Sequence, residues 1–411
     1  MRTGSRALLL SIAYGTSAAA NLLLSIALGR RFGAGALGVY AIAVAVARVF
    51  YATTELGMGA HLTRSVARDS QGANQRFGVF FAFRAFSIPF GALATVAIVV
   101  ATSDRGYVLA AFVACALGFV SLQSLCESIF LAREDQRTAA LLTLCSSGLV
   151  GLSASLWFVS PFELTEFGIA YGAAALSGLA IWLHRLRRSL GYRPAWCLSW
   201  KRLREETAAS WRIGASILLG IAALKTSVLV LGGFRSPKQV GAFAAVDMFV
   251  TATTILQSAV TGVAYPKLAR SFDRDPKRFT KVLWQSNAAL AVAGLFFALA
   301  LSTVGSQIAA MLFPSRDFAR IAELMPIMGW SAPALMLAQH NIFAFAAANR
   351  ERANLLLMLG WFLAILGFQL VLVPRYGLLG AAWGLLLSRL FAMGMLFAVV
   401  LLTGMHKGRQ S

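Results

Sequence analysis

LGRRFGAGALGVYAIAVAVARVFYATTELGMGAHLTRSVAR, residues 28–68, begins with a glycine-rich loop, continues as a long apolar helix and ends at a basic segment. The chain repeats this pattern at residues 231–270, LGGFRSPKQVGAFAAVDMFVTATTILQSAVTGVAYPKLAR. In this repeat Gly38 aligns with Gly241, and an aromatic residue follows each glycine at the second position. The spacing is far too long for a solenoid unit, so the repeat predicts two homologous halves.

The composition indicates a membrane protein. The 411 residues are 58% hydrophobic and only 13% charged, against about 25% charged in soluble domains. The mean hydropathy is +0.72, and a soluble chain of this size cannot hide so much apolar surface. We interpret the net charge of +21 as the excess of cations on cytoplasmic loops, and we expect no nucleic-acid partner.

We predict an all-α polytopic membrane protein with about twelve transmembrane helices in two pseudo-symmetric six-helix lobes. The expected organisation is a first lobe at 1–184, a cytoplasmic linker at 185–212 and a second lobe at 213–411. The predicted spans are 7–28, 36–59, 78–101, 107–131, 139–160, 167–184, 213–233, 241–265, 282–304, 321–347, 354–373 and 380–403.

The distribution of lysine and arginine between the loops indicates the orientation of these spans. The segments on the side of the termini hold 25 of the 37 cations, and the opposite loops hold 8. Because cytoplasmic loops carry the cationic excess, we expect both termini in the cytoplasm. The linker is cytoplasmic in this topology, and its Trp200, Leu203 and Trp211 can share one helical face. Two interpretations stay open for it, an amphipathic helix at the membrane surface and a plain basic linker.

Polar residues inside the predicted spans are the candidate functional residues, because a charge near the bilayer centre costs at least about 2.5–3.5 kcal/mol. Arg48 and Lys225 lie mid-span, one in each half, and are too central to reach water easily. The other candidates for a shared wet cavity are Arg84, Asp247, Asn21, Gln123, Glu127 and Glu55. We predict no catalytic residues and no metal ligands, because the sequence holds no metal-ligand cluster and no Ser/His/Asp set.

Each candidate also has a structural interpretation. Glu55 and Glu127 lie about one turn from a cytoplasmic span end, and Arg84 lies about two turns in, so all three can extend to the interface. Asp247 has two readings, neutralisation of Lys225 or Arg48 and a part in ion coupling, which the sequence does not separate. Arg389 in the last span is a candidate for a structural ion pair.

A further segment, VPRYGLLGAA at 373–382, completes a set of patterns whose order and spacing are fairly specific. Together with the two repeated segments, it resembles the polysaccharide synthase (oligosaccharide flippase, Wzx-like) family of the MOP exporter superfamily, whose fold is MATE-like. Members of that family often carry Asp-Arg just before the end of helix 7. Here Ser227 and Val228 occupy those positions, and Lys225 is the nearest charge.

The resemblance implies a bacterial inner-membrane flippase. It would move an oligosaccharide on polyprenyl diphosphate (an O-antigen, capsule or exopolysaccharide repeat unit) from the cytoplasmic to the outer leaflet. The implied partners are this lipid-linked oligosaccharide, membrane lipids and other polysaccharide-assembly proteins. No cofactor is implied, and a proton or sodium gradient is the candidate energy source. The alternatives are a MATE-type drug/cation antiporter and, from a different class, a membrane glycan polymerase or ligase.

Overall fold

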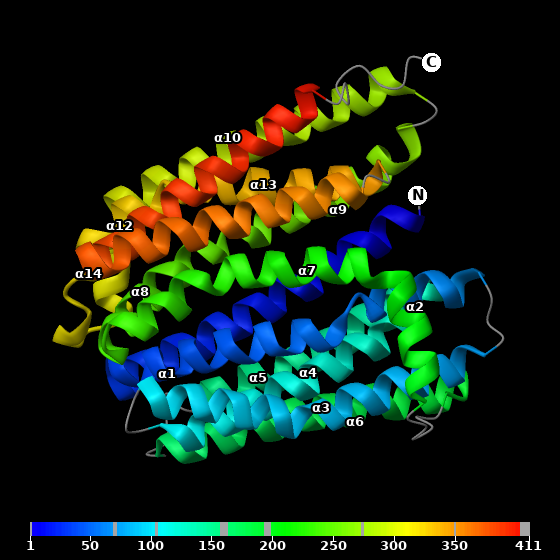
Figure 1. Cartoon of the computed structure of the whole chain (residues 1–411), viewed down its shortest axis with the longest axis horizontal. Coiled ribbons are helices and arrows are strands. Elements are labelled where there is room, and N and C mark those ends of the chain that lie inside the picture. The colour runs from blue at the N-terminus through cyan, green and yellow to red at the C-terminus, as the bar shows by residue number, and fades with distance from the viewer. Residues whose placement is uncertain are drawn as a thin grey trace.

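The structure is a computed structural model, which describes residues 2–68, 72–102, 106–156, 163–192, 199–272, 275–348 and 351–402. These residues form helices and short connections, with no strand among them. Figure 1 shows two bundles of roughly parallel helices, one built by the first half of the chain and one by the second. The predicted all-α fold with two lobes is confirmed. The first lobe contains α1 (Arg2–Glu55), α2 (Met58–Arg68), α3 (Ala73–Thr102), α4 (Tyr107–Ala132), α5 (Gln136–Leu156) and α6 (Leu164–Leu190).

The second lobe begins with α7, a long helix at Trp200–Phe234. It continues through α8 (Pro237–Ala252), α9 (Thr254–Ser271), α10 (Pro276–Thr303), α11 (Gly305–Leu312), the 3-10 turn η1 (Arg316–Phe318), α12 (Ile321–Gly329), α13 (Ser331–Ala347) and α14 (Glu351–Leu402). Helices α12 and α13 meet at an angle of 48°. Pro333 lies in the first turn of α13, where its ring fits a helix start but cannot continue a preceding helix.

Two of these helices are hairpins. Helix α1 has 54 residues, about 80 Å if straight, which is far more than a bilayer of about 30 Å needs. It reverses at Gly33, whose φ of 80° lies in the left-handed region that glycine adopts without strain. Helix α14 reverses in the same way at Gly377, with φ of 59°. Figure 1 shows the outgoing and returning parts of both helices side by side.

The helix count agrees with the predicted number of spans. Nine helices in the described residues are long and apolar enough to cross a membrane, or ten when the bent pair α12–α13 is taken as one span. Since α1 and α14 each cross twice, the ten become twelve crossings. Boundaries also agree closely for single helices, as for the predicted span 107–131 and α4 at Tyr107–Ala132.

The two copies of the sequence repeat contact each other directly. A Cβ atom on Gly38 would lie 1.8 Å from the carbonyl oxygen of Pro237, and one on Gly241 would lie 1.8 Å from the carbonyl oxygen of Ala34. The aligned glycines therefore sit where α1 and α8 cross with their backbones touching. Neither glycine has a positive φ, so the absence of a side chain, not backbone freedom, is what this crossing requires. The lobes are closed against each other at this end.

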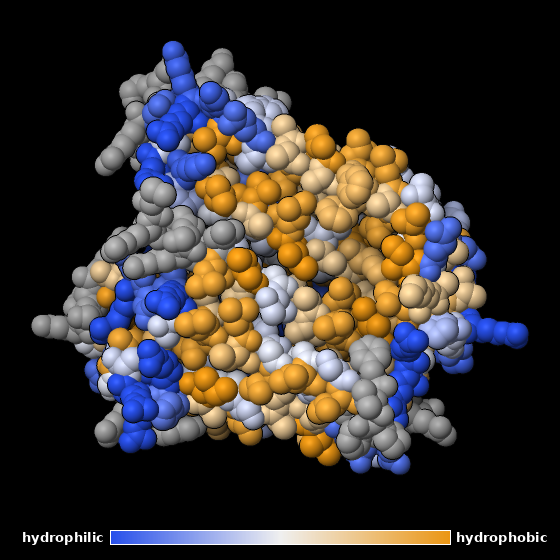
Figure 2. Space-filling view, turned by 180° about the vertical axis from the view of Figure 1, so that it is seen from behind, coloured by the Kyte–Doolittle hydropathy of each residue, from blue (hydrophilic) through white to orange (hydrophobic). Residues whose placement is uncertain are grey.

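Charged side chains gather at the two ends of the molecule and leave an apolar band between them (Figure 2). At the end with the Gly38–Gly241 crossing, Lys238 pairs with Asp317 at 3.4 Å. Beside them, Arg235 donates to the carbonyl oxygen of Pro374 at 3.0 Å. These residues come from the loops that hold the minority of the cations, so the structure gathers the predicted outward loops at one end.

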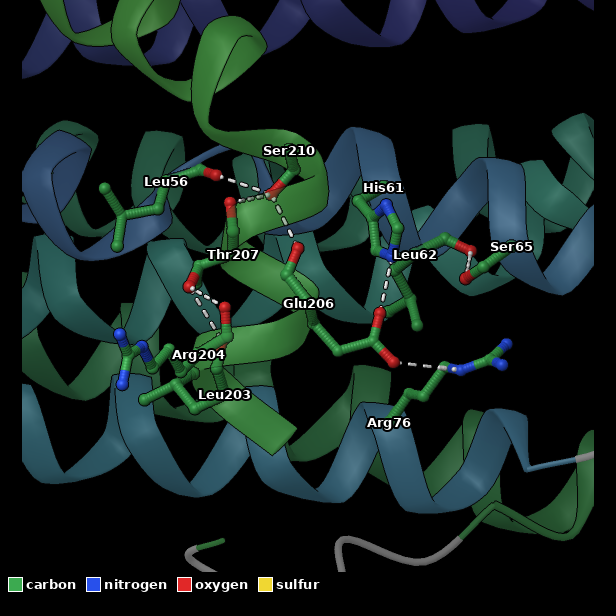
Figure 3. Close-up of polar contacts among 10 residues, drawn as sticks. All are labelled: Leu56, His61, Leu62, Ser65, Arg76, Leu203, Arg204, Glu206, Thr207 and Ser210. Atoms are coloured by element: carbon green, nitrogen blue, oxygen red, sulfur yellow. Dashed lines mark hydrogen bonds and ion pairs between the residues drawn. The ribbon is translucent and has the colours of Figure 1, made fainter. Parts of the chain in front are cut away.

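The predicted linker is partly helical and docks on the first lobe (Figure 3). Glu206, in the first part of α7, accepts from Arg76 of α3 at 3.2 Å and lies 2.5 Å from His61 Nε2 of α2. Leu203 is buried beneath it. Ser210 donates to the carbonyl oxygen of Leu56 at 2.9 Å. Figure 1 shows this part of α7 running across the direction of the other helices.

The docked segment decides how the linker residues face. Leu203 packs into the first lobe, while Trp200 and Trp211 stay exposed, so the three do not act as one apolar face. The first part of α7 is therefore a helix that docks on the first lobe through Glu206, and its place at the membrane surface stays a prediction. Gly57 and Gly214 touch where α7 leaves the first lobe: a Cβ on Gly57 would lie 2.9 Å from Gly214 N. Residues 193–198 of the linker lie outside the described residues.

Candidate functional site

The two central cations predicted from the sequence come one from each lobe and interact electrostatically with each other. Arg48 projects from the returning part of α1, and Lys225 projects from α7. Lys225 interacts electrostatically with Arg48, with Asp247 of α8 and with Arg389 of α14. The Arg48 side chain is exposed, although it belongs to a helix whose neighbouring positions are buried. An exposed cation in the middle of a span must face an open space inside the protein or the bilayer itself, and only the former is energetically reasonable.

Asp247 is held by Arg389. The Arg389 Nη2 atom lies 3.3 Å from Asp247 Oδ1, and Arg389 Nη1 donates to the hydroxyl of Ser331 at 2.6 Å. Arg389 is 2% exposed, so its charge is compensated locally. Three cations and one carboxylate leave this central group with a net formal charge of two positive. Among the described contacts, neither Arg48 nor Lys225 has an ion pair or hydrogen bond like those of Arg389.

Arg48 also lines a cavity inside the first lobe. This first-lobe cavity has a volume of about 190 Å³ and lies between α1, α4, α5 and α6. Three of the predicted polar residues, Asn21, Gln123 and Glu127, line it with Arg48. Tyr14 donates to Glu127 Oε1 at 2.6 Å across the cavity. The structure thus brings four predicted residues to one polar space.

The remaining polar groups in this cavity are already hydrogen-bonded in part. Gln123 donates to the carbonyl oxygen of Ala175 at 2.7 Å, and Asn21 donates to that of Ser17 at 2.8 Å. Each amide therefore keeps its oxygen for a visiting group, since an amide has both a donor and an acceptor end. A ligand with hydroxyl groups is the natural complement of such a lining.

Arg84 and Glu55 lie apart from the central group. Arg84 is 1% exposed, and its Nη2 lies 3.4 Å from Glu55 Oε1. Arg84 Nη1 also donates to the carbonyl oxygen of Ser121 at 2.9 Å. Burying a guanidinium requires such a partner set, so these contacts give Arg84 a structural task inside the first lobe. A substrate role for Arg84 and a coupling role for Glu55 stay predictions.

Two features of the site were not assigned from the sequence. Ser331, at the bend between α12 and α13, accepts from Arg389, and Tyr171 of α6 lies beside Arg48 in the first-lobe cavity. Ser331 gives no signal in the sequence, whereas Tyr171 is an aromatic hydroxyl within a predicted span. Ser227, which stands where similar proteins carry a charge, is buried and accepts from Gln369 at 2.7 Å. A neutral hydrogen bond thus replaces charge at this point of α7.

By sequence, residues 4–272 match the family described as "Polysaccharide biosynthesis protein". The match covers the first lobe, the linker and the start of the second lobe, including both copies of the repeat. No curated relative matches the chain by sequence.

Solved structures with a similar fold include transporters. A multidrug resistance MATE family transporter of the MOP superfamily in its inward-facing conformation superposes with a TM-score of 0.78 at 13% identity, covering 95% of this chain and 96% of that chain. The outward-facing conformation of such a transporter gives 0.66 at 14% identity, covering 99% and 96%. A MOP superfamily transporter from Pyrococcus furiosus gives 0.65 at 14% identity, covering 98% and 96%. The chain has the MOP/MATE-like fold.

Proposed function

Because the chain belongs to the polysaccharide biosynthesis protein family, we propose that it is a flippase for a lipid-linked oligosaccharide. The cargo is a glycan repeat unit on polyprenyl diphosphate, moved from the cytoplasmic to the outer leaflet of a bacterial inner membrane. The observation that carries this proposal is the pair Arg48 and Lys225, one cation from each lobe, at the centre of a membrane-spanning bundle. A diphosphate needs compensating charge there, because its desolvation in a low-dielectric medium is otherwise prohibitive.

The same pair argues against a cation as cargo. The central group is net positive, and a positive ligand would meet Arg48 and Lys225 with like charge. The fold supports alternating access, since pseudo-symmetric lobes commonly rock around a site between them. Contact at the Gly38–Gly241 crossing closes one end in this conformation. We propose a proton or sodium gradient as the energy source, and neighbouring polysaccharide-assembly proteins as partners.

Deleting the protein from its host tests the function. We expect surface glycan to disappear and lipid-linked repeat units to accumulate in the cytoplasmic leaflet, and we expect a plasmid copy to reverse both effects. The leaflet is assigned by whether an impermeant glycosidase reaches the glycan in intact cells. Deleting a polymerase or ligase would instead leave lipid-linked glycan that has already reached the outer face. If deletion changes only the export of cationic dyes, the chain is a drug antiporter and the proposal is wrong.

The proposed orientation places both termini in the cytoplasm. Cysteines introduced at Glu163 and Arg316 should react with an impermeant thiol reagent in intact cells, whereas cysteines at Arg202 and Lys277 should react only after permeabilisation. The native cysteines are replaced first, at positions 115, 126, 145 and 197. The 25 to 8 division of cations motivates this result. Labelling at Arg202 but not at Glu163 in intact cells would invert the topology.

A further inference from the structure

The two lobes carry cavities at matching positions. The second-lobe cavity has a volume of about 290 Å³ and lies between α7, α13 and the first part of α14. Residues 28–31 of α1 align with 231–234 at the end of α7, and the offset of 203 residues from Gly38 to Gly241 can be extended back along both helices. At this offset both cavities use the same three helical positions. The matched pairs are Tyr14 and Ile217, Ser17 and Gly220, and Asn21 and Leu224.

The matched cavities differ in chemistry. At each of the three positions a polar side chain in the first lobe is replaced in the second lobe by an apolar side chain or by glycine. The difference extends to the rest of α7 and to the other helices. The first-lobe cavity adds Gln123, Glu127, Ser146 and Ser147, and the second-lobe cavity adds Ile213, Ile221, Ile342 and Met358. Four polar residues of the second-lobe cavity, Ser216, Gln339, Asn354 and Trp361, are uncharged, and its one charged residue is Arg64 of α2.

Cations stand at both ends of the apolar wall of α7. Lys225 directly follows Leu224 in the chain, and Arg64 of α2 lines the cavity together with Ile213. The wall from Ile213 to Leu224 is eleven helical steps, about 16 Å long. Half of the hydrocarbon core of a bilayer is about 15 Å. The wall therefore matches one leaflet in length, and its inner end lies next to Lys225.

We propose that the two lobes divide an amphipathic cargo between them. The second-lobe cavity seats the part of the polyprenyl tail next to the phosphates, and the polar first-lobe cavity receives sugar hydroxyls. The diphosphate lies between them at Arg48 and Lys225. An isoprenoid chain gains by contact with apolar side chains, whereas sugar hydroxyls need the hydrogen-bond partners that the first lobe supplies. This inference rests on the proposed function and assigns the tail to a specific wall.

Photo-crosslinking tests the tail site. The purified protein, in nanodiscs, carries a photoreactive amino acid at Ile221, and the probe is polyprenyl phosphate without sugar. A matched control carries the same amino acid at Leu356, which is 66% exposed on α14. We expect crosslinking at Ile221 to exceed that at Leu356 about tenfold. The substitution Leu224→Asn should lower the Ile221 signal about tenfold, because it places an amide against the tail. Equal crosslinking at Ile221 and Leu356 would mean ordinary boundary lipid and overturn the proposal.

Two further arms identify the occupant and separate this inference from the flippase function. Excess phosphatidylglycerol should leave the crosslinking signal at Ile221 unchanged. If phosphatidylglycerol displaces the polyprenyl phosphate probe, the cavity is a phospholipid site and the proposal is wrong. Glycan export is measured in the same Leu224→Asn variant at normal abundance. Unchanged export and unchanged crosslinking would overturn the tail site while the flippase function stands. Export that does not depend on the protein, with preferential crosslinking retained, would overturn the flippase function instead.

Discussion

Replacing Arg48 by alanine reduces glycan export roughly thirtyfold or more, which is the expected result if this side chain binds the diphosphate. Removing one partner of a desolvated charge pair costs about 2–5 kcal/mol. Lys225→Ala should have an effect of the same order, because the two residues supply one cation from each lobe. Arg48→Lys should retain part of the activity, since lysine keeps the charge but loses the paired donors of the guanidinium. Lys225→Arg should be tolerated better than Lys225→Ala.

Export is measured in cells that lack the native protein, with the membrane abundance of each variant determined in parallel. The control is Arg320→Ala, which removes a cation from an exposed pair with Glu323 at 3.1 Å. Exposed pairs of this kind contribute about 0–1 kcal/mol, so export should stay normal. If Arg48→Ala and Lys225→Ala are both made at normal abundance and both export normally, the cationic site is wrong.

The positions of the helices could be predicted from the sequence because a bilayer requires a similar length of every span. Apolar runs of the right length predicted α4 almost to the residue, and the repeat predicted two related lobes. The repeat also pointed to Gly38 and Gly241, although their contact is visible only in the structure. Hydrophobicity carries no information on which helices face each other, so the crossing of α1 and α8 was not predictable from it.

The pairing of charges shows the same limit. The sequence marked Asp247 and Arg389 as membrane-embedded charges but did not pair them, because 142 residues separate them and the contact depends on how two helices are rotated. Arg84 looked like Arg48 by composition, yet Arg84 is buried against Glu55 while Arg48 is exposed. Only the packing of α1 against α3 distinguishes these two arginines. A cation inside a predicted span thus indicates a polar interior, but it does not show whether the residue binds a ligand or forms a structural ion pair.

Replacing Gly38 by alanine is expected to prevent the end with the Gly38–Gly241 crossing from closing. The added Cβ would lie 1.8 Å from the carbonyl oxygen of Pro237, and a backbone atom cannot turn aside as a flexible side chain does. Helices α1 and α8 must therefore separate, which removes the closed state from the transport cycle. We expect export to fall at least about tenfold, and Gly241→Ala should act alike, because its Cβ would meet Ala34 in the same way.

Spin labels report the separation directly. Labels at Arg30 and Ser236, exposed positions on the two lobes near this crossing, should move apart by several ångströms in Gly38→Ala. The matched control is Gly233→Ala, a glycine near the same end of α7 with no atom within 4 Å of its added Cβ. It should leave both the distance and export unchanged, since alanine also favours the helix. Normal export by Gly38→Ala with an unchanged label distance would show that transport does not require this crossing to close, and that the lobes do not rock about it.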